Sequence, residues 1–502
     1  MMQYDVCVIG GGPSGFAAAM RAIDLGKKTL LIEKNKLGGA GIFNGALSSK
    51  TLWELAENYS MMRARNYGYE VAHYQLDYRS VIGEMHQAEI DRYQQLRQQV
   101  DFFVQTGQLD FMEGSGKLTS QHVVEISRKN GKTSVWADNI ILATGSRPRK
   151  LNHIPIDEKI IVTSDGIGNF DHFPESIVIL GAGVIGCEFA TILSSFDRTR
   201  VFLIDKQPRI LPFEDEDIAE VIANELESKG VTIHKESELS SMKVVDGKVE
   251  YELLYRDGRR ETHVVEKALI SVGRIPNVEG LGLEDIGVIT DGQNFCENED
   301  CTTNIPNIFA VGDLTADIAL VNIAELEGRH AVEKAYGLVH KPIVYNNIST
   351  IMFLRPEVAA VGMNEIQARK QGIPYRVASI NFGFISRAIA KRQKIGFFKI
   401  MVTDDDEMRI LGMRAVGPNA SSNIQAMALL IYMQKGVQEL AEMVHAHPSM
   451  PEGVQECARM LLGKSILKPS VFGVSLKCYR VDTLGNVHAW QHKKEAGVFQ
   501  HG

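Results

Sequence analysis

One pattern occurs twice in this chain: an apolar strand, a glycine-rich turn, a helix and a second strand that ends in an acidic residue. The first copy runs from YDVCVIG through Gly10, Gly12 and Gly15 to KTLLIEK, which contains Glu33. A glycine turn between strand and helix, with an acidic residue about 20 positions later, is the fingerprint of a dinucleotide-binding βαβ unit. The repeat therefore predicts two dinucleotide sites on doubly wound parallel sheets.

The glycines of the first copy have separate tasks. Gly10 permits the tight turn, Gly12 lets the backbone approach a pyrophosphate, and Gly15 lets the helix pack closely on the strand. The helix N-terminus offers N–H groups and the positive end of its dipole to the phosphates. Glu33 is predicted to accept hydrogen bonds from the ribose hydroxyls.

The second copy, SIVILGAGVIGCE followed by RVFLID, contains Gly181, Gly183 and Gly186 and places Asp205 at the end of its second strand. A carboxylate there accepts the 2′-hydroxyl of NAD and repels the 2′-phosphate of NADP. Two cations in the next segment, KQPR, weaken that preference. Because of the Asp205 carboxylate, NAD is favoured; because of the two cations, NADP stays an open alternative.

Size and charge narrow the class of protein. A chain of 502 residues is long enough for about three domains, and its net charge of −8 offers no basic field for nucleic acid or anionic lipid. No apolar run approaches the ~18 residues of a membrane-spanning helix, and the N-terminal sequence has no secretory signal pattern. We expect a cytoplasmic enzyme that acts on small molecules, with no nucleic-acid partner and no membrane span.

The cysteines give no sign of a disulfide framework or a metal site, because they are scattered through a long chain. They are Cys7, Cys187, Cys296, Cys301, Cys457 and Cys478. The pair Cys296 and Cys301 has the C-x4-C spacing of redox cysteines, but it precedes the strand in PNIFAVGD within an ordinary strand-and-loop segment. No redox role is expected for it.

Further motifs follow the first fingerprint in a fixed order: EKNKLGGAGIFNGALSSK, ATGSRP, GAGVIGCE, VGRIPN, PNIFAVGD and HAHPSMPE. Together they resemble the class I pyridine nucleotide–disulfide oxidoreductases of the dihydrolipoamide dehydrogenase type, over about residues 4–465. The resemblance implies an α/β fold with two doubly wound, Rossmann-like domains and a C-terminal α+β dimerisation domain. It also implies FAD at the first fingerprint, NAD at the second, and a homodimer.

The same resemblance divides the chain into domains. Residues 1–150 and 276–345 correspond to the FAD-binding domain, 151–275 to the NAD-binding domain and 346–465 to the dimerisation domain. The last segment, 466–502, contains VSLKCYRVDTLGNVHAW, which predicts a β-hairpin with a Gly-Asn turn.

One segment departs from the family pattern G-G-T-C-x4-C-x-P-S-K. Here Gly41 and Ala46 take the cysteine positions and Ser48 takes the proline position. Neither glycine nor alanine can form a thiolate or a mixed disulfide. We expect thiol–disulfide exchange by the family's route to be absent, and the volume vacated around residues 39–46 to admit a flat acceptor or a second nucleotide.

Other residues match the family's machinery. Lys50 matches a lysine beside the flavin N5 edge, Glu188 matches its ion-pair partner, and the nicotinamide is expected beside Ile185 and Glu188. Gly273 and Arg274 match positions where the NAD site borders the FAD domain. The resemblance also assigns cofactor contacts to Lys34, Gly39, Gly114, Thr144, Gly145, Ser146, Gly312 and Asp313.

His447 and Glu452, in HAHPSMPE, match a dyad in which the glutamate orients a histidine base toward the partner subunit. Such a dyad suits acid–base work near neutral pH. Because the thiols are absent, the histidine is predicted to protonate a different acceptor, such as a quinone oxygen. The alternative is that the dyad is only a structural remnant.

These expectations describe an FAD-dependent NAD(P)H oxidoreductase that passes electrons from reduced flavin directly to a non-disulfide acceptor of the quinone or dye type. Its expected partners are NADH and that small-molecule acceptor. Three alternatives stay open: a soluble NAD(P) transhydrogenase, a dihydrolipoyl dehydrogenase by resemblance alone, and a low-turnover flavin-binding protein that acts through its dimer surface or C-terminal tail.

Overall fold

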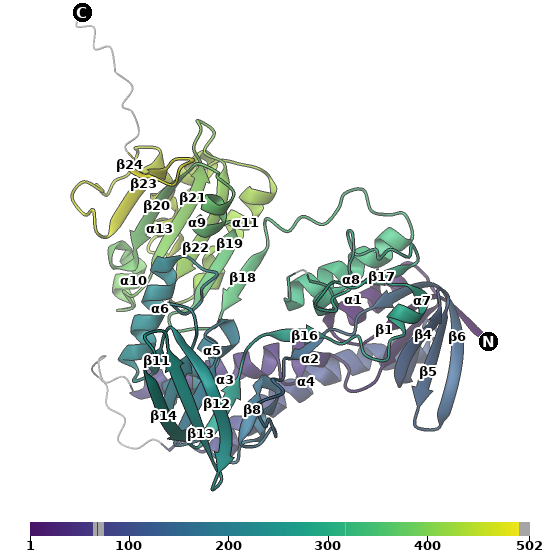
Figure 1. Cartoon of the computed structure of the whole chain (residues 1–502). Coiled ribbons are helices and arrows are strands. Elements are labelled where there is room, and N and C mark those ends of the chain that lie inside the picture. The colour runs from purple at the N-terminus through teal and green to yellow at the C-terminus, as the bar shows by residue number, and fades with distance from the viewer. Residues whose placement is uncertain (64–67, 69–74, 317, 491–502) are drawn as a thin grey trace, which may run out of the picture. The chain divides into compact units, whose positions relative to one another are not determined.

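The structure, a computed structural model, describes residues 1–63, 68, 75–316 and 318–490 (Figure 1). The chain forms two compact units. The first contains residues 1–181, 195–204 and 238–343, and the second contains residues 182–194, 205–237 and the chain from 344 onward. The first fingerprint therefore lies within the first unit.

The first fingerprint belongs to a sheet whose central strands are parallel. Strand β1 (Met2–Ile9) pairs in parallel with β2 (Thr29–Glu33) and β6 (Gly131–Leu142), and β2 pairs in parallel with β3 (Leu109–Glu113). Strand β17 (Ile308–Ala310) pairs in parallel with β6, while β5 (Val123–Arg128) and β4 (Ser115–Ser120) extend the sheet with antiparallel pairing. Every residue of β2 is buried, as in a parallel strand that is covered on both faces.

Helices α1 (Pro13–Asp24) and α8 (Val321–Ala335) pack against each other in this unit. A Cβ atom built on Gly328 would lie 2.1 Å from the carbonyl oxygen of Ser14, so these helices approach too closely for a side chain at position 328. Helix α1 begins with a proline, which suits a first turn whose N–H groups have no helical partner. The helices α3 (Ala46–Arg63) and α4 (Tyr78–Gln105) also pack against each other.

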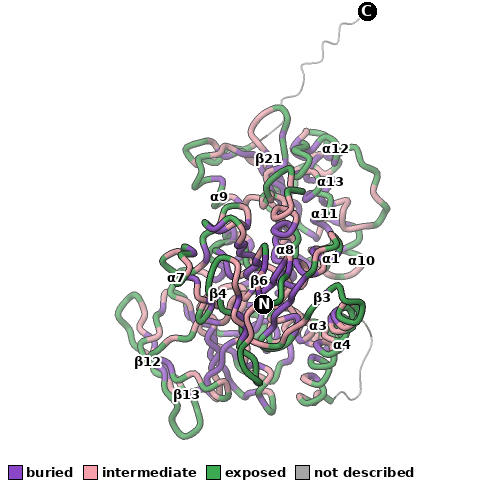
Figure 2. The backbone as a smooth tube through the Cα atoms, turned by 90° about the vertical axis from the view of Figure 1, so that its right-hand side faces the viewer, coloured by how far each residue is buried: buried purple, intermediate pink, exposed green. Residues whose placement is uncertain are grey.

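The strands before and after the second fingerprint form another parallel sheet. Within the first unit its order is β10 (Arg200–Ile204), β9 (Ser176–Leu180), β15 (Lys267–Ile270) and β8 (Ile161–Thr163). An antiparallel sheet of β12 (Ser237–Val245), β13 (Lys248–Tyr255) and β14 (Arg260–Val265) is separate from it, and its hairpin end is exposed (Figure 2). Strands β7 (Ser146–Pro148) and β16 (Arg274–Pro276) form a two-stranded ribbon.

The second unit contains an antiparallel sheet of order β18-β19-β22-β21-β20-β23-β24. Its strands are β18 (Ser349–Met352), β19 (Val358–Gly362), β20 (Tyr375–Asn381), β21 (Phe397–Thr403), β22 (Ile410–Val416), β23 (Leu476–Val481) and β24 (Val487–Ala489). Its helices include α9 (Glu365–Lys370), α11 (Gln425–Tyr432) and α13 (Pro451–Leu461). The predicted α/β class with a C-terminal α+β domain is confirmed.

The hairpin β23–β24 continues this sheet beyond β20 (Figure 1). Its connection is longer than the expected two-residue Gly-Asn turn. Asp482 accepts the backbone N–H groups of Leu484 and Asn486, and Gly485 has a positive φ of 84°. The side chain of Asp482 thus closes a loop that spans residues 482–486.

Helix α5 (Val184–Ser195) follows the second fingerprint and lies almost entirely in the second unit, as does α6 (Glu216–Ser228). Across the described ranges, every helix is too short or too polar to cross a lipid bilayer. Within the same ranges, no group of three or more His, Cys, Asp or Glu side chains is placed to hold a metal ion.

Candidate active site

The first glycine turn has the shape that a dinucleotide needs. Gly10 has a φ of +109°, and a Cβ atom there would lie 2.3 Å from the carbonyl oxygen of Ala143. A Cβ atom on Gly15 would lie 1.8 Å from the carbonyl oxygen of Gly10, whereas one on Gly12 would meet nothing within 4 Å. Two glycines are therefore required by contacts within the protein, and Gly12 faces the open space where a pyrophosphate fits.

Glu33, at the end of β2, holds this turn in place. One carboxylate oxygen accepts the backbone N–H of Gly11 at 2.6 Å, and the other accepts that of Asn35 at 2.7 Å. Each oxygen keeps a further lone pair that can accept a ribose hydroxyl. Two more predicted residues adjoin this region: Gly114 donates its N–H to the Glu33 carbonyl oxygen, and a Cβ atom on Gly39 would lie 3.3 Å from the Cα atom of Gly12. Lys34, next to Glu33, is exposed.

The second fingerprint repeats this arrangement with Asp205. Its carboxylate accepts the backbone N–H of Ala182 at 2.7 Å and that of Gln207 at 2.8 Å. Gly181 has a φ of +102°, and a Cβ atom there would lie 2.6 Å from the carbonyl oxygen of Ser271; a Cβ atom on Gly183 would meet nothing within 4 Å. The residues present fit a second dinucleotide as well as the first.

The two cations beside Asp205 differ in their surroundings. The guanidinium of Arg209 donates to the carbonyl oxygens of Glu214 at 2.7 Å and Pro212 at 3.1 Å. Arg209 is thus engaged in its own loop, while Lys206 is exposed. The engagement of Arg209 favours NAD, whereas the exposure of Lys206 does not.

A polar cluster joins three predicted sites in the first unit. Ser146 donates to Asp313 at 2.8 Å, and Arg274 donates to the hydroxyl of Ser146 at 2.7 Å and to its carbonyl oxygen at 2.9 Å. Arg274 also lies 3.8 Å from the Asp313 carboxylate, as an ion pair. The structure therefore brings Ser146 and Asp313, which are predicted to contact FAD, together with Arg274, which is predicted to lie where the NAD site borders the FAD domain; these roles stay predictions.

Two further residues of this region were not predicted. Asn277 donates to the carbonyl oxygen of Thr144 at 2.9 Å, accepts the Thr144 hydroxyl at its own carbonyl oxygen, and donates its N–H to Gly145. Asn277 is the last residue of the motif VGRIPN, so the sequence motif could have identified it as a site residue. Glu327, only 1% exposed, accepts the N–H of Gly312 at 2.7 Å, and nothing in the local sequence indicates this role.

The thiol-free segment is broken into two helices, α2 (Gly39–Ile42) and α3. Asn44 lies in the break with a φ of 52°. A Cβ atom on Gly41 would lie 2.6 Å from the Cγ atom of Pro13, and one on Gly45 would lie 1.8 Å from the carbonyl oxygen of Ala40. The expectation of a vacated volume is wrong at Gly41, where the Pro13 ring fills the space beside the glycine. Gly45 is not one of the two cysteine positions, and at Ala46 the expectation stays a prediction.

A buried carboxylate on α4, that of Glu89, contacts the thiol-free segment, and the sequence did not predict this contact. Glu89, 5% exposed, lies 2.5 Å from the hydroxyl of Ser48 and 3.0 Å from Nδ1 of His86. The Ser48 hydroxyl also lies 2.9 Å from the carbonyl oxygen of Ile42. These contacts connect α2, α3 and α4 immediately before Lys50.

Lys50 and Glu188 lie in different units. Lys50, on α3, donates to the hydroxyl of Ser49 at 3.3 Å. Glu188 is 5% exposed and accepts the backbone N–H of Phe353 at 2.9 Å, and Ile185 precedes it on α5 as a half-buried residue. The expected ion pair between Lys50 and Glu188, and the role of Gly273 and Gly186 in binding NAD, stay predictions.

His447 and Glu452 form a dyad within one chain. Nδ1 of His447 lies 2.7 Å from one oxygen of Glu452, and the other oxygen accepts the backbone N–H of Ser449 at 2.7 Å. Burial raises the pKa of Glu452, but the Ser449 N–H and His447 outweigh it and lower the pKa overall. If Nδ1 donates to the carboxylate, Nε2 is free to exchange a proton, and the His447 side chain is 69% exposed.

The cysteines are poor candidates for redox chemistry. Cys296 and Cys301 are 1% and 2% exposed, and burial raises the pKa of Cys296 to about 12. Burial likewise raises the pKa of Cys7 and Cys478 to about 12, and that of Cys187 and Cys457 well above the ordinary thiol value. The thiols whose pKa is raised stay protonated near neutral pH, and a thiol is a weak nucleophile compared with its thiolate.

Comparisons with known proteins agree with this geometry. Residues 4–328 match the family model described as pyridine nucleotide-disulphide oxidoreductase, and residues 348–458 match the dimerisation domain of the same family. The chain belongs to this family. The pyridine nucleotide-disulphide oxidoreductases of the dihydrolipoyl dehydrogenase type use FAD and NAD(H). The binding of FAD at the first fingerprint and of NAD(H) at the second stays a prediction.

Among the family's curated members, the chain is 33% identical to dihydrolipoyl dehydrogenase of Bacillus subtilis, covering 92% of this chain and 99% of that protein. It is 32% identical to mitochondrial dihydrolipoyl dehydrogenase of Schizosaccharomyces pombe, covering 92% and 91%. Among solved structures, LpdA from Mycobacterium tuberculosis matches with a TM-score of 0.83 at 25% identity, covering 91% and 99%. The flavoprotein disulfide reductase RclA from Escherichia coli matches in fold, with a TM-score of 0.81 at 23% identity, covering 92% and 100%.

Proposed function

We propose that this flavoprotein transfers electrons from NADH to a non-disulfide acceptor of the quinone or dye type, as a homodimer. The observation that carries the proposal is the segment GGAGIFNGALSSK, which holds no cysteine between Gly38 and Lys50. The family pattern has two cysteines there, at positions that align with Gly41 and Ala46. Without a thiol in this segment, electrons have no disulfide through which to leave the flavin.

The packing of the segment supports the proposal. A side chain at position 41 would meet the Pro13 ring at 2.6 Å, so the site is shaped for glycine and not for cysteine. The remaining thiols do not offer a substitute, since Cys296 and Cys301 are buried.

FAD, when bound, supplies the redox chemistry, because it accepts a hydride from NADH and returns two electrons to an acceptor. The residues of this chain provide binding and charge. The turn at Gly12, the N-terminus of α1 and Glu33 would hold the first dinucleotide, and the turn at Gly183 with Asp205 would hold the second. Lys50 would place a positive charge beside the flavin.

His447 would supply a proton to the acceptor. Glu452 orients its ring through Nδ1, at 2.7 Å, and the exposed side chain is available to a second subunit. The match to the family's dimerisation domain over residues 348–458 supports a homodimer. In that dimer, His447 of each subunit would complete the site of the other. A quinone needs protons as well as electrons, which gives this dyad a task that requires no thiol.

Anaerobic reoxidation tests the proposal. The holoprotein is reduced with one equivalent of NADH, then mixed with 1,4-benzoquinone, dichlorophenolindophenol, oxidised lipoamide or a thio-NAD analogue. Rapid reoxidation by the quinone and the dye, with none by lipoamide, is expected. Rapid reoxidation by lipoamide would overturn the proposal in favour of the activity named for the curated relatives, and reoxidation by thio-NAD alone would favour a transhydrogenase.

A further inference from the structure

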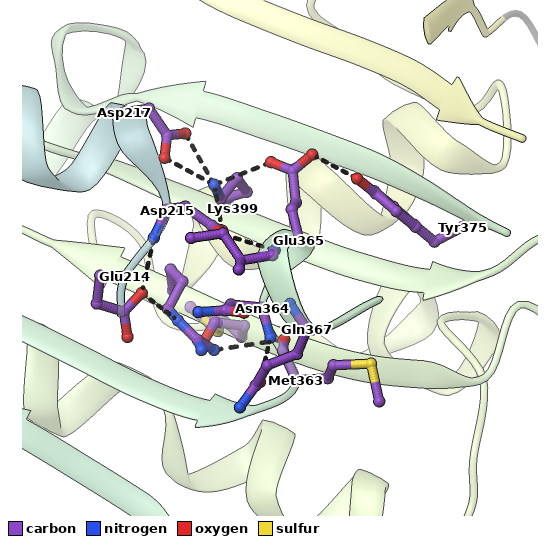
Figure 3. A network of polar contacts seen from close by, with 12 residues as sticks. Glu214, Asp215, Asp217, Met363, Asn364, Glu365, Gln367, Tyr375 and Lys399 are labelled. Atoms are coloured by element: carbon purple, nitrogen blue, oxygen red, sulfur yellow. Dashed lines mark hydrogen bonds and ion pairs between the residues drawn. The ribbon is translucent and has the colours of Figure 1, made fainter. Parts of the chain in front are cut away.

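A buried lysine of the dimerisation domain binds three carboxylates at once. Nζ of Lys399, on β21, lies 2.8 Å from Asp215, 2.8 Å from Asp217 and 3.1 Å from Glu365 (Figure 3). Its side chain is 4% exposed. Burial lowers the pKa of Lys399, but the attraction of Asp217, Asp215 and Glu365 outweighs it, so the pKa rises and the ammonium stays charged.

A second buried cation, Arg414, binds Glu214, which directly precedes Asp215. Nε of Arg414, on β22, lies 3.0 Å from the carboxylate of Glu214, and the two side chains are 6% and 7% exposed. Further hydrogen bonds add to the ion pairs: Asn364 donates to the carbonyl oxygen of Phe213 at 2.9 Å, and the N–H of Ile366 donates to the Asp215 carboxylate at 3.3 Å. Residues 213–217, where α6 begins, are therefore fixed to the dimerisation domain.

The loop that ends at residues 213–217 begins at Asp205, the carboxylate that is predicted to bind the ribose of NAD. Asp205 binds the fingerprint turn at Ala182, and further along the loop Leu211 donates its N–H to the carbonyl oxygen of Ala182 at 2.9 Å. Arg209 then donates to the carbonyl oxygen of Glu214, which joins the middle of the loop to its anchored end. A continuous set of contacts thus runs from the Lys399 group to the glycine turn.

We propose that Lys399 is a positioning residue for nucleotide binding: it fixes the loop of residues 205–217, and through that loop it sets the affinity of the second fingerprint for NAD(H). The inference rests on NAD(H) binding at that fingerprint. It concerns binding alone and holds whatever the final acceptor is. The dimerisation domain thereby acts on nucleotide affinity as well as on assembly.

The test compares variants of the holoenzyme. Asp217→Asn removes one charge from the group at its most accessible carboxylate, whose side chain is 37% exposed. Lys399→Met combined with Asp215→Asn removes a buried cation together with its most buried anion, and leaves Asp217 and Glu365 without their ammonium partner. Glu216→Gln is the matched control, because Glu216 is an exposed acid in the same first turn of α6.

The dissociation constant of NAD⁺ is measured by calorimetry on oxidised holoenzyme, and flavin reduction is followed at saturating NADH. We expect the dissociation constant to rise by about tenfold in the double variant, and by less in Asp217→Asn. FAD content and the limiting rate of flavin reduction should stay unchanged in both, and Glu216→Gln should match the wild type.

Unchanged nucleotide affinity in folded, FAD-loaded Asp217→Asn and in the double variant would overturn the inference. If the double variant fails to fold, Asp217→Asn decides, and wild-type affinity there contradicts the positioning role. Failure of the wild type to bind NAD⁺ would instead refute the nucleotide assignment on which the inference rests.

Discussion

Asp205→Asn removes the charge expected to select NADH over NADPH while nearly preserving the shape of the side chain. Backbone N–H groups of Ala182 and Gln207, at 2.7 Å and 2.8 Å, hold both carboxylate oxygens in place, so the charge cannot turn away from the nucleotide. Two unit charges about 4 Å apart repel by about 1 kcal/mol in water and about 4 kcal/mol at an effective dielectric constant of 20. For this half-buried residue, the expected preference for NADH is between about 5-fold and about 1,000-fold.

In Asp205→Asn, this preference should be largely lost. The amide nitrogen faces one of the two backbone N–H groups, so the turn loses a hydrogen bond and the efficiency with NADH also drops, by roughly 1–3 kcal/mol. The assay is kcat/KM for each nucleotide with one dye acceptor, at low and high salt because the repulsion is screened. Lys206→Gln is the control, since it removes the exposed neighbouring cation. An unchanged NADH/NADPH ratio in Asp205→Asn, or a wild type that prefers NADPH, would refute the reasoning.

Three further predictions concern other parts of the structure. His447→Ala should slow reoxidation of the flavin by a quinone by about 10²–10⁴-fold and leave flavin reduction by NADH nearly unchanged. Stopped-flow measurement of both half-reactions checks this prediction. Equal losses of rate in both half-reactions would point to a packing role. Glu89→Ala removes the buried partner of Ser48 and should destabilise the protein by about 1–3 kcal/mol. The loss of stability should be smaller for Glu89→Gln and absent for Glu84→Gln, because Glu84 is exposed. The temperature of FAD release compares the stability of these variants. Lys399 lowers the pKa of Asp215, against the effect of burial, so this ion pair stabilises the protein above the ordinary aspartate pKa of about 4 and the contribution is lost as the pH falls below it. In acid denaturation, the variant Lys399→Met/Asp215→Asn should therefore lose less stability between neutral pH and pH 3 than the wild type, and an equal loss would contradict this.

The parts of the fold that depend on local sequence could be predicted. The end of β2 at Glu33 and the glycine turn before α1 follow from hydrophobic periodicity and from the stereochemistry of glycine, both of which act over a few residues. The hairpin of β23 and β24 likewise follows from the predicted strand–turn–strand pattern, although its loop is longer than a two-residue turn.

The buried polar groups could not be predicted, because their partners are far apart in the sequence. Ser48 and Glu89 are separated by 41 positions, and Lys399 and Asp215 by 184. No periodic pattern marks a carboxylate on α4 or a lysine on β21 as a ligand of a distant loop. Only the tertiary fold brings such groups together.

The error about the vacated volume has a different cause. Reasoning from the two lost side chains treats the surrounding backbone as fixed. In the structure the segment packs Gly41, which is one of the two cysteine positions, against the Pro13 ring. Side-chain loss was visible in the sequence, whereas the path of the backbone that closes the space was not.

The number of NADH molecules needed to reduce the protein tests the central claim most directly. Flavin accepts two electrons, and a redox disulfide would accept two more. Anaerobic titration of the oxidised holoprotein should bleach the flavin absorbance with one NADH per FAD and give no long-wavelength band from a thiolate beside the flavin. Uptake of two NADH per FAD, with such a band appearing after the first, would show that a disulfide takes part and would contradict the account.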